Sequence, residues 1–293
     1  MIYFLLEISM KIAICLYGKF TGKTNRGENQ DFRKPYEYLS ANILSNNCDI
    51  FFHGWDDDDA QSAELVNLLK PKKYILEKQK QFSTPYKQFE YTINGPWNSE
   101  ACLFNIYSRS YSLKRSVSLV DDTYDLVLIA RFDTLFYSKI NFQIFSPDNF
   151  YVTHWNLLNQ GWGLNDGWFI TGYDNAKNFA KLFDRLKHYY KIDSDFLFFA
   201  KKHKLSENEL TSGHLPWRYR LVELGLESNI YAYGLEYETW GLLRRFGIRT
   251  NPFGRPDVDI KTPIPIYSSQ INHRMYFINY LKYKLQCLIN YLS

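Results

Sequence analysis

Residues 125–133 read Asp-Leu-Val-Leu-Ile-Ala-Arg-Phe-Asp, an apolar run that ends in charged side chains. A continuous apolar run without polar alternation is typical of a strand buried on both faces of a parallel sheet. In open α/β sheets, ligands bind outside the carboxyl ends of the strands. We therefore predict that Arg131 and Asp133 emerge at a ligand-binding edge of the sheet.

Shorter apolar runs alternate with helical patterns on both sides of this segment. The order favours a single α/β domain with a mostly parallel central sheet flanked by helices, because no Pro/Gly/Ser-rich linker divides the chain into two cores. Predicted strands span residues 12–17, 48–53, 74–76, 150–153 and 230–233, and a turn followed by a strand is predicted at 166–172. Predicted helices span residues 35–44, 56–69, 101–119 and 175–189. A further helix is predicted to end at 224, and an amphipathic helix is predicted at 274–292.

The composition narrows the class of protein. The chain has 293 residues, 45% of them hydrophobic, which is enough for a core without disulfides. The formal net charge is only +4, with acidic and basic residues mixed along the chain, so we expect no nucleic-acid partner. The four cysteines are widely spaced, and we find neither a signal peptide nor a membrane-spanning run. These features predict a reduced, cytoplasmic protein. We expect no role in the fold for the nine residues before Met10.

A glycine-rich turn follows the first predicted strand. Gly18 and Gly22 flank three residues and precede Lys23 and Thr24, one residue short of a phosphate-binding P-loop, and the sequence that follows is typical of a loop rather than a helix. Three interpretations remain open: a P-loop, a plain surface turn, and a nucleotide-facing loop in which Lys19 or Arg26 meets phosphate as a point charge.

Two carboxylates are candidates for metal binding or catalysis. Asp133 is placed to coordinate a hard divalent cation together with phosphate oxygens; the alternative is that Arg131 pairs with another acid and Asp133 caps a turn. Asp166 lies beside Gly167 and Trp168, where partial desolvation would raise its pKa and suit it to act as a general base. The alternative is that Asp166 caps a turn and the aromatic residues belong to the core.

Five segments in this order resemble a GT-A-fold glycosyltransferase. They are the strand ending in Gly18, the stretch Asp-Ile-Phe-Phe-His-Gly-Trp at 49–55, the helix after it, the strand 126–133, and Asn-Asp-Gly-Trp-Phe at 165–169 with Gly172. The likeness covers about residues 10–240 and is to the small enzymes of bacterial surface-polysaccharide clusters and large DNA viruses. It implies a GT-A-like, Rossmann-like catalytic domain at 10–250, with a donor half at about 10–135 and an acceptor half at about 136–250, and an extension at 251–293.

The resemblance also implies roles for single residues. The D-x-D motif of these enzymes, which binds a divalent metal and the diphosphate of a nucleotide sugar, matches Arg131 to Asp133, an R-x-D variant. It implies that Gly18, Lys19, Arg131 and Asp133 bind the nucleotide sugar. Asp133 would also bind Mg²⁺ or Mn²⁺, unless Arg131 makes the metal dispensable. Asp166, in a segment close to a D/E-x-x-F-x-G pattern, would deprotonate the acceptor hydroxyl.

The implied activity is the transfer of a hexose or related sugar from a nucleoside-diphosphate donor to a glycan or lipid-linked acceptor in polysaccharide biosynthesis. Trp162, Trp168 and Trp217 would form sugar-stacking walls, and helix 274–292 offers a peripheral membrane contact or packs on the domain. The alternatives are a P-loop-like kinase or sulfotransferase using Gly22-Lys23-Thr24, and a non-catalytic carbohydrate-binding protein. His53 and His214 are weaker candidates, more simply explained as structural residues.

Overall fold

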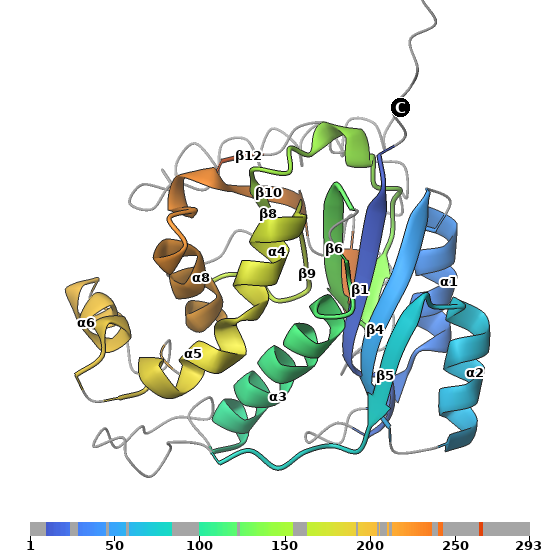
Figure 1. Cartoon of the computed structure of the whole chain (residues 1–293), viewed down its shortest axis with the longest axis horizontal. Coiled ribbons are helices and arrows are strands. Elements are labelled where there is room, and N and C mark those ends of the chain that lie inside the picture. The colour runs from blue at the N-terminus through green and yellow to red at the C-terminus, as the bar shows by residue number, and fades with distance from the viewer. Residues whose placement is uncertain are drawn as a thin grey trace, which may run out of the picture.

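The computed structural model of the chain describes the central sheet and the helices around it (Figure 1). The described residues are 10–23, 29–44, 47–56, 59–83, 100–121, 124–154, 163–191, 193–203, 205, 210, 213–235, 240–242 and 264–265. The predicted helix 274–292, residues 84–99 and the predicted domain boundary at 250 lie outside these ranges.

Within the described residues, the central sheet has eight strands in an order that confirms the predicted α/β class. Six strands run in one direction, and β9 and β12 run against them. From one edge to the other, the strands are β5 (Lys73–Glu77), β4 (Cys48–Trp55), β1 (Ile12–Lys19), β6 (Leu126–Arg131), β9 (Trp168–Gly172), β8 (Phe150–His154), β10 (Ile230–Leu235) and β12 (Ile264–Pro265).

Both faces of this sheet are buried, which explains the continuous apolar runs. In β1, Ala13 and Cys15 belong to one core cluster, whereas Ile14 and Leu16 belong to the other. Successive residues of a strand point to opposite faces. A strand covered on both sides therefore needs apolar side chains at every position.

Helices cover the two faces separately (Figure 1). The cluster that contains Ile14 also holds apolar residues of α1 (Arg33–Asn42) and α2 (Asp59–Leu69). The cluster that contains Cys15 holds residues of five helices. These are α3 (Glu100–Val117), α4 (Tyr173–Ala180), α5 (Leu182–Tyr189), α6 (Asp195–Lys202) and α8 (His214–Glu223).

Two small antiparallel ladders lie beside the central sheet, and two short 3₁₀ turns, η2 (Phe142–Ile144) and η3 (Glu227–Asn229), precede β8 and β10. One ladder pairs β7 (Thr134–Phe136) with β11 (Trp240–Leu242). The other pairs β2 (Thr21–Lys23) with β3 (Asn29–Asp31). Because Gly22 and Lys23 lie in an extended strand and not at the start of a helix, the P-loop interpretation is wrong.

The helices differ from the sequence-based prediction in two places. The predicted helix 175–189 is two helices, α4 and α5, which meet at Lys181. Helix α6 was not predicted; Ser194 caps its start, because the Ser194 side chain accepts a hydrogen bond from the Leu197 amide at 3.2 Å. None of the helices in the described ranges is long and apolar enough to cross a membrane.

Candidate functional site

The strand order places a topological switch point between β1 and β6. From β1 the chain moves outward to β4 and β5, and it then returns to the other side of β1 as β6. A crevice for ligands forms where neighbouring strands lead in opposite directions in this way. Tyr17 pairs with Arg131 at this edge, so Gly18 and Lys19 at the end of β1 lie at the edge where β6 ends.

The antiparallel direction of β9 brings Asp166 to the same edge. Ala130 near the end of β6 pairs with Trp168 at the start of β9, and Asp166 stands two residues before Trp168. The Thr134 hydroxyl donates to the Gly167 carbonyl at 3.0 Å and fastens the two segments. Three residues predicted from the sequence, Arg131, Asp133 and Asp166, are therefore neighbours.

Arg131 and Asp133 form a two-pronged ion pair. Arg131 Nε donates to Asp133 Oδ1 at 2.8 Å, and Arg131 Nη2 donates to Asp133 Oδ2 at 2.6 Å. Arg131 is 9% exposed and Asp133 is 4% exposed. This parallel fork is the strongest geometry of an arginine with a carboxylate, and burial strengthens its electrostatics.

Asp166 joins this pair to a second arginine. Its Oδ2 atom lies 3.3 Å from Arg131 Nη1 and also accepts from Arg109 Nη1. Asp166 is 4% exposed, so its charge needs these partners. We call Arg109, Arg131, Asp133 and Asp166 the charge cluster; two cations and two anions balance within it.

Arg109 is a member of the charge cluster that the sequence did not reveal. It lies on α3 and faces Gly213, whose backbone has a φ of +82° at the start of α8. A Cβ atom on Gly213 would lie 2.7 Å from Arg109 Nη2. Glycine at this position therefore permits both the left-handed turn and the close approach of the guanidinium.

The segment that carries Asp166 is fixed to the start of α8. The Leu164 amide donates to the His214 carbonyl at 3.0 Å, and His214 Nδ1 lies 2.8 Å from the Leu164 carbonyl oxygen. A Cβ atom on Gly163 would lie 2.6 Å from His214 Cβ, so these two backbones pass very close to each other. His214 has a structural role here that needs no ligand.

A buried polar chain holds the end of β1. The Gly18 amide donates to Ser112 Oγ at 2.7 Å, Ser112 Oγ lies 2.7 Å from His53 Nδ1, and His53 Nε2 lies 2.8 Å from Glu77 Oε1. Burial is the largest cause that lowers the pKa of His53, to about 4. A neutral imidazole satisfies both neighbours when Nε2 donates and Nδ1 accepts. His53 is therefore structural, and Gly18 is positioned through it.

The described residues do not by themselves fit a resident metal. Both carboxylate oxygens of Asp133 already accept from Arg131, which takes the place a cation would occupy. Within the described ranges, no group of three or more His, Cys, Asp or Glu side chains could hold an ion. The arrangement favours a guanidinium over a metal as the local positive charge, and Asp133 as a metal ligand stays a prediction.

The tryptophans are core residues, so their predicted role as sugar-stacking walls is wrong for the two that are described. Trp217 is 0% exposed and packs against Phe169 and Phe179. Trp168 is 1% exposed and packs against Phe136. Trp162 lies outside the described residues. The open aromatic surface that the carbohydrate-binding alternative needed is therefore not made by these rings.

Comparison of the sequence with protein families and with curated proteins finds no match. Among solved structures, the chain is similar to mouse xyloside xylosyltransferase 1 in its apo form, with 12% sequence identity and a TM-score of 0.40. The similarity covers 76% of this chain and 84% of that one. The fold class rests on the strand order and not on this likeness.

Proposed function

We propose that the protein is a glycosyltransferase that moves a sugar from a nucleoside-diphosphate donor to a glycan or lipid-linked acceptor. The observation that carries the proposal is the convergence of Arg131, Asp133 and Asp166 at the switch point of a mostly parallel sheet, with Gly18 and Lys19 at the adjoining strand end. A cation and two acids at this edge offer the charges that leaving-group stabilisation and proton removal require.

In this proposal, Arg131 meets the diphosphate of the donor. A guanidinium binds phosphate through the same two-pronged geometry that it uses for a carboxylate. The diphosphate would therefore replace the Asp133 carboxylate on Arg131, with Lys19 as a second positive charge at the end of β1. Fixed positive charge at the bridging oxygen stabilises the nucleoside diphosphate as it leaves and lowers the barrier by several kcal/mol, on the order of 3.

Asp166 is the residue that we assign to the acceptor. Both ion pairs that Asp166 forms within the described part of the chain use Oδ2, so we assign the proton of the acceptor hydroxyl to Oδ1. Arg109 and Arg131 hold the carboxylate in one orientation, and a base that is already oriented loses little entropy when it reacts. Before the donor binds, Asp133 orients Arg131 from the other side.

The test is the release of nucleoside diphosphate from a panel of UDP-, GDP- and ADP-sugars in the presence of saccharide acceptors. We expect one donor to be turned over by the native protein, and Asp166→Asn to lower the rate by about 10²–10⁴-fold while donor binding is retained. Asp184→Asn, which changes a surface acid paired with Lys114, is the matched control and should keep full activity. Full activity of Asp166→Asn, or no turnover of any donor, would contradict the proposal.

A further inference from the structure

A buried side-chain amide next to Asp166 has no hydrogen-bond partner among the described residues. Asn165 is 3% exposed, and its Nδ2 atom, which carries two N–H donors, meets no acceptor there. Within the described part of the chain, it is the one side-chain amide nitrogen that is buried in this way. Because the great majority of buried donors in proteins are paired, this exception points to a partner that the chain itself does not supply.

The orientation of the Asn165 amide is fixed by its oxygen. Oδ1 accepts a hydrogen bond from the Gly167 amide at 2.9 Å. A backbone N–H needs an acceptor, so the oxygen and not the nitrogen must face Gly167. A rotation that exchanged the two atoms would set donor against donor. The unpaired atom of Asn165 is therefore a donor, and a ligand that pairs with it must supply an acceptor.

The backbone on both sides of Asn165 is held in place. On one side, the Leu164 amide donates to the His214 carbonyl at 3.0 Å. On the other side, the Thr134 hydroxyl donates to the Gly167 carbonyl at 3.0 Å. The Asn165 side chain cannot seek another partner without disturbing these two anchored segments. A donor that is held in advance in this way loses little freedom when a ligand binds.

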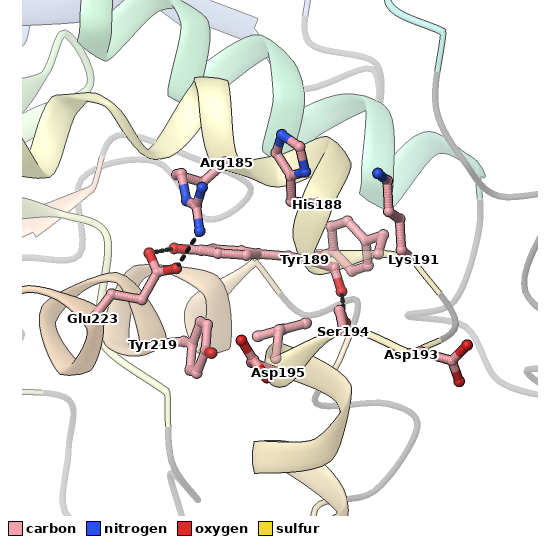
Figure 2. A pocket seen from close by; sticks show the side chains of 11 residues that line it. Arg185, His188, Tyr189, Lys191, Asp193, Ser194, Asp195, Tyr219 and Glu223 are labelled. Carbon is pink, nitrogen blue, oxygen red and sulfur yellow. Dashed lines mark hydrogen bonds and ion pairs between the residues drawn. The ribbon is translucent and has the colours of Figure 1, made fainter.

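The polar groups around another hollow of the molecule bind one another. Figure 2 shows this hollow, of about 610 Å³, among α5, α6 and α8. There Glu223 accepts from Arg185 Nη2 at 3.0 Å and from the Tyr189 hydroxyl. Ser194 Oγ donates to the Tyr189 carbonyl at 2.5 Å. These groups are satisfied within the chain and need no ligand, in contrast to Asn165 Nδ2.

Asn165 lies at the edge of the sheet that carries the charge cluster. It is the residue before Asp166, and both precede β9, which runs beside β6. In the proposed function, Asp166 Oδ1 takes the proton of the acceptor hydroxyl. A saccharide carries further hydroxyls on adjacent carbons, and each hydroxyl oxygen can accept a hydrogen bond. A sugar bound at Asp166 therefore brings hydrogen-bond acceptors to the neighbouring residue.

We propose that Asn165 binds the acceptor saccharide, with Nδ2 donating to a hydroxyl next to the one that reacts. The proposal rests on the transferase function proposed above and adds to it a residue that selects the acceptor. The sugar hydroxyl supplies the hydrogen-bond acceptor that the described chain lacks at this point. A saccharide without that hydroxyl leaves the buried NH₂ group unpaired, and sites built to bind a hydroxyl discriminate strongly against analogues without it.

The test is the kinetics of sugar transfer to methyl glycosides of glucose, galactose and mannose and to their monodeoxy analogues. Asn165→Ser removes the NH₂ group and keeps a hydroxyl that can accept from the Gly167 amide. We expect this variant to raise the KM for the acceptor saccharide by at least about tenfold. Asn67→Ser, the same change at an exposed position on α2, is the matched control and should leave this KM unchanged.

The deoxy analogues show whether the effect of Asn165 is direct. In the native protein, one of them should have a KM raised by at least about tenfold. In Asn165→Ser, the same analogue should have the KM of its parent sugar, because the two changes remove the same hydrogen bond. A merely structural role of Asn165 would leave the two effects additive. Additive effects would therefore overturn the proposal.

Further outcomes separate Asn165 from the transferase function itself. If the native protein turns over no donor, both proposals fail. If the native protein is active and Asn165→Ser and Asn165→Asp both keep its acceptor KM, only the role of Asn165 fails. A rise in the KM for the donor alone would place Asn165 at the donor sugar and overturn the proposal as well. Asn165→Asp keeps an oxygen towards Gly167 and lacks the donor, so a raised acceptor KM in both variants supports the proposal. Circular dichroism checks that both are folded.

Discussion

Arg131 binds both carboxylate oxygens of Asp133, two residues along the chain, at 2.8 and 2.6 Å beneath the surface of the protein. The two residues are not bonded only to each other, because Arg131 Nη1 also lies 3.3 Å from Asp166 Oδ2. One guanidinium thus links the end of β6 to Asp166, which stands two residues before the start of β9. A ligand that displaces either carboxylate changes the contacts of the other.

Loss of Arg131 should destabilise the fold. Arg131→Ala leaves two buried carboxylates with reduced compensation, and removal of one partner from a buried ion pair costs about 3–5 kcal/mol. Urea unfolding followed by circular dichroism measures the change in free energy. Lys34→Ala, which removes an exposed pair with Glu37, should leave the midpoint unchanged. A wild-type midpoint for Arg131→Ala would show that the charge cluster contributes no stability.

Two glycines in left-handed conformations should respond differently to alanine. Gly225 has a φ of +69° and open space around a Cβ atom, so Gly225→Ala should cost only the backbone strain, about 1–2 kcal/mol. Gly213 has a φ of +82° and faces Arg109 Nη2, so Gly213→Ala should cost more and should also displace the guanidinium from Asp166. Chemical denaturation of both variants gives the comparison. Equal losses would mean that Arg109 moves aside without cost.

His53 should make stability depend on pH. Burial lowers the pKa of His53 from 6.5 to about 4, so the unfolded chain takes up a proton more readily than the native one as the pH falls below 6.5. The contribution of neutral His53 to the free energy of unfolding is fully present above pH 6.5 and is lost as the pH falls towards 4. For such a difference in pKa this contribution is about 3 kcal/mol. Denaturation at pH 4–7 measures the slope. His53→Gln should flatten it, and an unchanged slope would assign the effect to other groups.

The assignment of Trp217 to the core predicts a large effect on stability. Trp217→Ala should cost about 3–5 kcal/mol, because the buried indole leaves a cavity beside Phe169. Phe198→Ala, at a side chain that is 71% exposed, is the matched control and should change stability little. If Trp217→Ala were as mild as the control, the ring would not be part of the core.

The sequence predicted the central strands well, because a strand buried on both faces leaves a continuous apolar run, as at 12–17 and 126–130. It also indicated Arg131, Asp133 and Asp166 as candidates from their positions next to strands, and the structure brings these three side chains together. It did not reveal Arg109, since the contact with Asp166 depends on the antiparallel placement of β9 beside β6. Trp168 lies on a face of the sheet that is buried in the core. No feature of the local sequence distinguishes such a buried ring from a ring that lines a cleft.

Binding of nucleoside diphosphates tests the central claim most directly. We predict that one of UDP, GDP, ADP and CDP raises the melting temperature of the native protein by several degrees, since a ligand at about 100 times its Kd stabilises by about 2.7 kcal/mol. Because Arg131 supplies the positive charge, the shift should persist in EDTA and should be lost in Arg131→Lys. If none of the four nucleotides shifts the melting temperature, with or without Mn²⁺, the charge cluster is not a diphosphate site.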